Sequence, residues 1–88
     1  MKLKYNFVVN KVVDKYVAVA VGDDLEKFNG FVKMNSIGAE IFDMLKEDIT
    51  VEQVVDAMAE KHPDAEIEDV KSTVTGFIEK LKDSEIIE

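Results

Sequence analysis

The residues that could do acid–base or metal chemistry are few, and they are not grouped in the sequence. His62 is the single histidine and precedes Pro63, which forces a preceding helix to end there. Asp23, Asp24 and Glu26 could hold a cation, but their spacing is not that of a calcium-binding loop. There is no cysteine, no phosphate-binding glycine motif and no serine elbow. The sequence therefore predicts no enzyme activity, no cofactor and no metal site.

Composition and charge narrow the class of protein. The 88 residues suffice for one domain with a modest core, and 47% of them are hydrophobic. Residues 1–35 carry a net charge of +2 and residues 36–88 one of -10, within a total of -8. The acidic half disfavours nucleic-acid binding, because such binding depends on cations that neutralise phosphates. With no signal peptide and no apolar run of about 20 residues, we expect a cytoplasmic protein.

The first 34 residues have the pattern of a three-stranded sheet. The predicted elements are a strand over residues 7–13, a turn at Asp14-Lys15, a strand at Tyr16–Val21, a loop at Leu25–Gly30 and a strand at Phe31–Met34. In that loop the Asn29-Gly30 pair can adopt positive φ. In the second strand Val17, Val19 and Val21 alternate with Tyr16, Ala18 and Ala20, so one of its faces is better suited to burial.

The remaining residues have helical spacing. Asn35 and Ser36 can cap a helix that runs to about Lys46. Its Gly38 lowers helix propensity, which we expect a close approach to a neighbouring element to offset. Thr50 and Gln53 match the capping box of a second helix. The third helix carries an apolar stripe of Ile67, Val70, Val74, Phe77 and Leu81, widened by Ile78, and Ile86-Ile87 after it either fold back or extend.

The fold class expected is thus α+β, a three-stranded antiparallel sheet followed by three helices in one domain. The Phe31–Met34 strand comes last in the sheet, so one of its borders is expected to be unpaired. Such a border offers N–H and C=O groups to another chain. Beside an apolar helix it suits β-augmentation, in which a peptide adds to the sheet as a further strand. The same border could also pair with a second copy of the chain.

Three segments together resemble a known family. They are V-K-M-N-S-I-G-A-E-I-F-D-M-L, D-I-T-V-E-Q-V-V-D-A-M and E-D-V-K-S-T-V-T-G-F-I-E-K-L-K-D-S-E-I-I-E. Their order is similar to that of the coenzyme PQQ synthesis protein D (PqqD) family, whose members are also called RiPP recognition elements. The resemblance covers about residues 5–88. One departure is Glu47-Asp48-Ile49, where many relatives have Asp-Gly before the second helix.

The resemblance implies a winged-helix-like fold and a non-catalytic, chaperone-like role. The leader segment of a precursor peptide would add beside Phe31, Val32, Lys33 and Met34. The last helix would bound this groove with Lys71, Val74, Thr75 and Ile78, and the sequence leaves open which of Val74 and Ile78 lines it. The module would present the peptide to a modifying enzyme, commonly a radical SAM protein. The alternatives are a winged-helix nucleic-acid-binding protein and an adaptor that binds only an enzyme.

Overall fold

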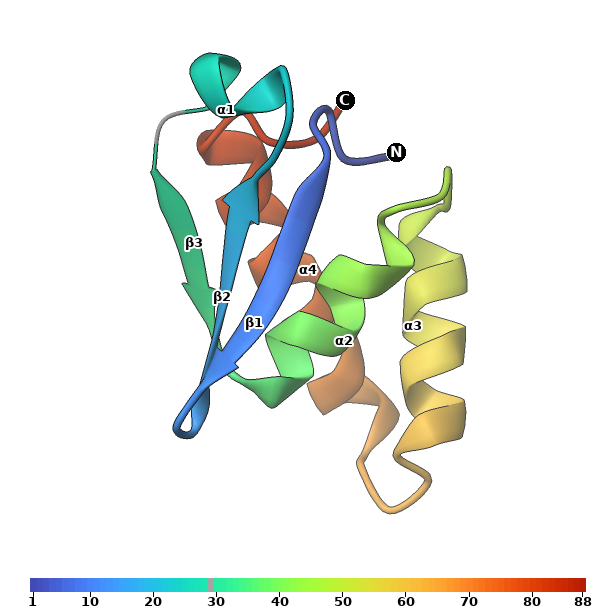
Figure 1. Cartoon of the computed structure of the whole chain (residues 1–88). Helices are drawn as coiled ribbons and strands as arrows, with labels where there is room; N and C mark the ends of the chain where they lie inside the picture. The colour runs from blue at the N-terminus through green and yellow to red at the C-terminus, as the bar shows by residue number, and fades with distance from the viewer. Residues whose placement is uncertain (29) are drawn as a thin grey trace.

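The computed structural model describes residues 1–28 and 30–88 and shows a sheet packed against helices (Figure 1). The elements are β1 (Phe7–Val12), β2 (Lys15–Ala20), α1 (Asp24–Lys27), β3 (Phe31–Met34), α2 (Ser36–Met44), α3 (Val51–Lys61) and α4 (Ile67–Asp83). This confirms the α+β class and the three antiparallel strands followed by helices. The conformation expected for Asn29 lies outside the described residues. Gly30 has a φ of 145°.

The short helix α1 occupies part of the segment predicted to be a loop. Asp24, its first residue, accepts two hydrogen bonds from Asn6, one from the main-chain N–H at 2.7 Å and one from the side-chain amide at 3.1 Å. These bonds join the start of α1 to the residue before β1. The helix has only four residues. The sequence pattern around α1 does not indicate this contact with Asn6, which lies 18 positions away.

The sheet has the order β1-β2-β3, and both pairs are antiparallel. Val12 lies opposite Lys15, so the turn is Val13-Asp14, one residue earlier than predicted. Val13 has a φ of 59°, whereas Asp14 is not among the residues with positive φ. A positive φ at only the first of two loop residues is the pattern of a type II′ turn, which favours glycine there. The turn was predicted one residue too late because Val13, an apolar β-branched residue, was assigned to the preceding strand.

The sheet buries the face of β2 that carries the small residues. Ala18 and Ala20 are fully buried, and the ring of Phe7 on β1 meets Phe42 of α2 edge-on at 5.3 Å between centroids. Val17 and Val19 lie on the opposite face, half-buried and not packed against the core. Alanine lets large aromatic side chains from elsewhere fill the space between sheet and helices.

The helices begin as their sequences predict. Asn35 Oδ1 accepts a hydrogen bond from the Gly38 N–H at 2.8 Å at the start of α2. At α3 the two bonds of the capping box are both formed, from Gln53 N–H to Thr50 Oγ1 at 3.1 Å and from Thr50 N–H to Gln53 Oε1 at 3.0 Å. These caps satisfy main-chain donors that would otherwise lack partners.

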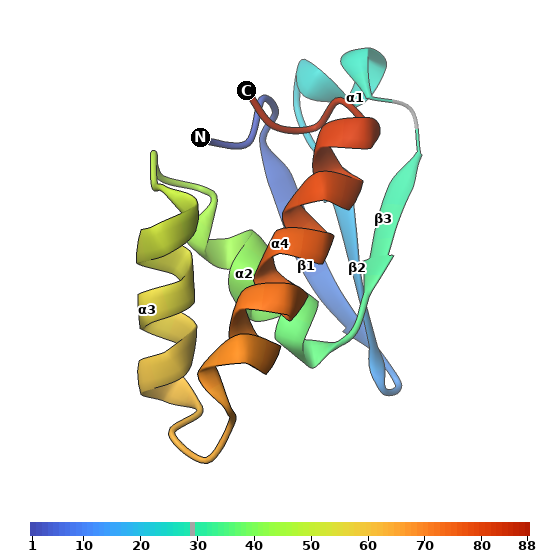
Figure 2. The ribbon, with the colours of Figure 1, turned by 180° about the vertical axis from the view of Figure 1, so that it is seen from behind.

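The segment after α4 folds back and pairs with the N-terminal residues. Leu3 bridges Ile87, Lys4 N–H donates to Ile86 C=O at 2.7 Å, and Ile86 and Ile87 are buried. The two ends of the chain therefore lie side by side, next to the α2–α3 side of the molecule and away from β3 (Figures 1 and 2). The two terminal segments pair with each other, and neither of them covers the border of β3.

Candidate peptide-binding site

The strand β3 pairs with β2 on one side only. No other strand in the described part of the chain pairs with its second border, and α4 passes beside β3 on the face that carries the core (Figure 2). Such an unpaired border is a row of main-chain donors and acceptors. The Phe31–Met34 segment therefore has the main-chain geometry that strand addition needs.

One hydrogen bond at the end of the β1–β2 ladder fixes where the main-chain groups of β2 point. The Val21 N–H donates to the Asn6 C=O at 3.0 Å, and these residues continue the register that pairs Phe7 with Ala20. In an antiparallel ladder the main-chain groups of successive residues point alternately to the two sides. Val21 points toward β1, so Ala20 and Ala18 point toward β3.

The same alternation divides the residues of β3. Ala18 lies opposite Val32, so the N–H and C=O of Val32 point toward β2. The N–H and C=O of Met34 also point toward β2. The main-chain groups of Phe31 and Lys33 then point away from the sheet. These two residues offer the N–H and C=O groups that an added strand would use.

The side chains of β3 alternate between the two faces of the sheet. Val32 and Met34 face the helices, and Met34 is buried. Phe31 and Lys33 face away from the helices, and Phe31 remains 63% exposed. The strand therefore presents two main-chain pairs at its border and one apolar and one cationic side chain on its outer face.

The four residues predicted for the helix wall lie in two different surroundings. Val74 and Ile78 are both core residues, with exposed fractions of 1% and 2%, and of the two it is Val74 that also lines the cavity at the end of β3. Lys71 and Thr75 line a hollow together with residues of α3: Val51, Glu52, Val55 and Asp56. They lie on the α3 side of α4, because positions 71 and 75 are separated from the β3 side by the core stripe.

The side of α4 that approaches β3 carries Phe77 instead. A Cβ added to Gly38 would lie 2.9 Å from Phe77 Cε1 and 3.1 Å from Met34 Cβ, so these three residues meet where β3 leads into α2. This confirms the close approach expected of Gly38. Thr73, one turn before Phe77, lines a cavity with Asn35. Neither Thr73 nor Phe77 was predicted to lie at the site, and the apolar spacing of the last helix assigned Phe77 to its core stripe.

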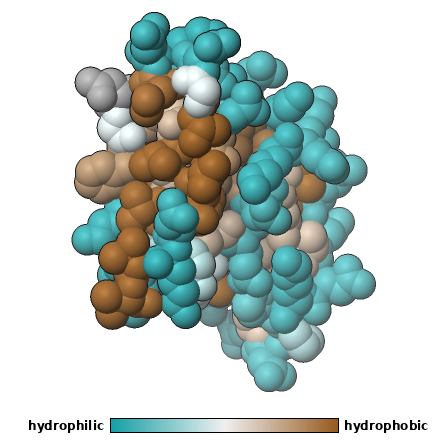
Figure 3. Space-filling view, in the orientation of Figure 1, coloured by the Kyte–Doolittle hydropathy of each residue, from teal (hydrophilic) through white to brown (hydrophobic). Residues whose placement is uncertain are grey.

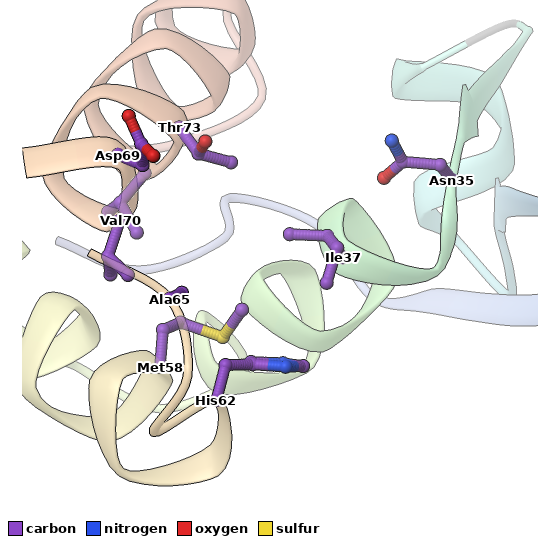
Figure 4. Close-up of a pocket in the computed structure, with 9 residues that line it drawn as sticks. Asn35, Ile37, Met58, His62, Ala65, Asp69, Val70 and Thr73 are labelled. Atoms are coloured by element: carbon purple, nitrogen blue, oxygen red, sulfur yellow. The ribbon is translucent and has the colours of Figure 1, made fainter. Parts of the chain in front are cut away.

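A cavity of about 350 Å³ opens where β3 ends (Figure 4). It lies between α4 on one side and α2 on the other, with α3 closing it below. Its walls are mainly apolar, and they are formed by Asn35, Ile37, Met58, His62, Ala65, Asp69, Val70, Thr73 and Val74. An apolar cavity with a few polar groups suits an apolar side chain of a ligand.

Two contacts between titratable groups join separate elements of the fold. His62 Nε2 lies 2.8 Å from a carboxylate oxygen of Glu40. This contact joins the end of α3 to α2, which supports a structural role for His62. A hydrogen bond of 2.8 Å from the Met1 amino group lowers the pKa of Asp48, in the loop before α3.

Within residues 1–28 and 30–88, no three potential metal ligands are clustered. None of the described helices combines the length and apolarity that crossing a bilayer requires.

The sequence pattern of coenzyme PQQ synthesis protein D (PqqD) matches residues 16–87. The chain belongs to the PqqD family. This confirms the resemblance seen in the three segments, although the match begins at Tyr16 rather than near residue 5 and leaves β1 outside it. The PqqD family consists of non-catalytic binding proteins, in agreement with the prediction that the chain is not an enzyme. Among curated proteins no match is found.

A solved structure shares the fold. The protein TbiB1, in complex with the TbiA(beta) leader peptide, superposes with a TM-score of 0.74 at 22% sequence identity. The comparison covers 100% of this chain and 95% of TbiB1. At this level of identity the similarity establishes the three-dimensional arrangement shared by the two proteins.

Proposed function

We propose that the chain binds the leader segment of a ribosomally made precursor peptide by strand addition to β3. The observation that carries the proposal is the unpaired border at which Phe31 and Lys33 direct their main-chain groups away from β2. TbiB1, which shares the fold, is seen with a leader peptide bound. Membership of the PqqD family is a second, independent support.

The site divides the recognition between main chain and side chains. The main-chain groups of Phe31 and Lys33 bind a leader of any sequence, whereas the surroundings select among leaders. On the helix side these are Phe77, Thr73 and the cavity at the end of β3. On the outer face the ammonium of Lys33 offers a local cation in a chain of net charge -8. We expect a dissociation constant of about micromolar, near -8 kcal/mol.

The bound leader is then presented to the enzyme that modifies the precursor, which we propose to be a radical SAM protein. The site contains no group that could carry out a covalent step on the peptide itself. Its role is to raise the local concentration of the precursor at the enzyme. We place this event in the cytoplasm, where ribosomes make the precursor.

The experiment is a titration of the ¹⁵N-labelled chain with the leader peptide of the precursor encoded beside it. The amide signals of Phe31–Met34 should shift at micromolar peptide, and those of β1 should not. Shifts confined to β1, the other border of the sheet, would overturn the site. No shift anywhere at millimolar leader would overturn the function and favour an adaptor that binds only the enzyme.

Two further arms separate the alternatives. Titration with duplex DNA at low salt tests nucleic-acid binding, for which the net charge of -10 over residues 36–88 predicts no interaction. Sedimentation without leader tests whether two copies pair through β3. A dimer that dissociates when leader is added would show that both occupants use the same border.

A further inference from the structure

The outer face of the sheet carries apolar side chains that no helix among residues 1–28 and 30–88 covers. Val8 of β1 lies opposite Val19 of β2, and Val19 lies opposite Phe31 of β3, so one apolar row crosses all three strands. Val8 is 44% exposed and Phe31 63% exposed. The next row has Val17 in its centre. Figure 3 shows brown, hydrophobic atoms over the sheet on the left of the molecule, reaching down to the hairpin tip.

These side chains are not spare members of the core. The helices α2 and α4 lie on the opposite face, where Ala18, Ala20 and Met34 are buried (Figures 1 and 2). Val17 and Val19 do not pack against the core cluster. Contiguous apolar surface of this kind marks an interaction site on a folded protein.

The charges on the three strands indicate the chemistry of the partner. The strands β1, β2 and β3 contain Lys11, Lys15 and Lys33 and no acidic residue, in a chain with 19 Asp and Glu residues. Lys33 lies opposite Val17, and Lys15 lies opposite Val12, so both belong to the outer face. The partner surface that complements this face is apolar and bounded by carboxylates.

We propose that this outer sheet face docks the peptide-modifying enzyme, through an apolar surface of the enzyme that is bounded by carboxylates. The inference rests on the proposed function. A leader strand added at β3 extends the sheet by one strand, so its outward side chains continue the row formed by Val8, Val19 and Phe31. The enzyme then contacts the chain and its bound leader as one surface, and the leader strengthens docking.

A second copy of the chain fits this face less well. A symmetric dimer through the outer faces places the same surface patch of the two copies against each other. Lys15 and Lys33 of one copy would then approach those of the other with no acidic residue on either set of strands. Like charges across an interface oppose association. The face therefore suits a different, acidic protein.

The test uses the purified modifying enzyme and the leader peptide encoded beside this chain, with Val8→Glu as the decisive variant. Val8 lies on β1, so leader binding at β3 should stay within twofold of that of the original chain. The affinity of the leader-loaded chain for the enzyme should fall at least tenfold. Val8→Lys should lower this affinity less, since it adds no negative charge. Ile67→Glu is the matched control, because Ile67 is 46% exposed but lies at the start of α4.

The outcomes are separable. Enzyme affinity within twofold in a folded Val8→Glu variant, or no binding of the enzyme to the original chain, overturns the inference. So does a dimer of the original chain that Val8→Glu abolishes, since a second copy then occupies the face. If Val8→Glu does not fold, Lys15→Glu replaces it, with a several-fold loss expected that shrinks at high salt. Failure of the leader to bind the original chain instead overturns the proposed function.

Discussion

Replacing Lys33 by proline tests the border of β3 at one atom. The Lys33 N–H points away from β2, so its removal takes no hydrogen bond from the sheet. Proline is tolerated on an edge strand when its missing N–H faces outward. The preceding residue, Val32, already has the extended conformation that proline requires of it. We therefore expect the free energy of unfolding to change by less than about 1 kcal/mol.

Leader binding should fall far more. The variant loses one main-chain hydrogen bond, worth about 0.5–1.5 kcal/mol net, and leaves a carbonyl of the leader without a donor, at a cost of about 1–3 kcal/mol. The sum of about 1.5–4.5 kcal/mol corresponds to a weakening of roughly 10- to 2,000-fold. Isothermal titration with the leader peptide measures this loss, and urea denaturation measures the stability.

Two matched variants isolate the missing N–H. Lys33→Ala removes the side chain and its charge but keeps the donor, so it should bind the leader within a few-fold of the original chain. Val32→Pro removes an N–H that points toward β2, so it should destabilise the sheet itself. A folded Lys33→Pro variant that binds the leader as tightly as Lys33→Ala would refute the reasoning.

The remaining predictions concern the fold. Val13→Gly should stabilise the chain by about 1 kcal/mol and raise Tm by about 4–8 °C. The reason is that Val13 is 88% exposed and has a φ of 59°, which a β-branched residue adopts only with strain. An unchanged or lower Tm would argue against this turn. Gly38→Ala should destabilise by about 1 kcal/mol in urea denaturation, because its Cβ would lie 2.9 Å from the Phe77 ring. Gly76→Ala on α4, with no atom within 4 Å of the added Cβ, is the control and should stabilise by about 1 kcal/mol. Equal stabilisation by both alanines would show that the Phe77 ring is free to move.

The features that could be predicted from the sequence are those set by nearby residues. The cap at Asn35 and the capping box at Thr50 each involve residues three positions apart, and both formed as expected. The order of strands and helices followed from a change in apolar spacing near residue 35. The hairpin turn was misplaced by one residue, because Val13 occupies a backbone conformation that its residue type disfavours.

The parts that could not be predicted depend on packing between distant elements. The buried face of β2 is the one with alanines, because Phe7 and Phe42 fill the space above it. The helix wall depends on the rotation of α4 about its axis. Thr73 and Phe77 lie on one flank of its core stripe and the predicted Lys71 and Thr75 on the other. The flank with Phe77 is the one that meets Gly38, and that with Lys71 and Thr75 faces α3.

Amide hydrogen exchange along β3, with and without leader peptide, is the most direct test of strand addition. In the free chain the N–H groups of Val32 and Met34 should be protected by β2, and those of Phe31 and Lys33 should exchange rapidly. With leader bound, Phe31 and Lys33 should become protected, and the outward groups of β1 should not change. Leader binding that leaves Phe31 and Lys33 exchanging at their free rates would contradict strand addition at this border.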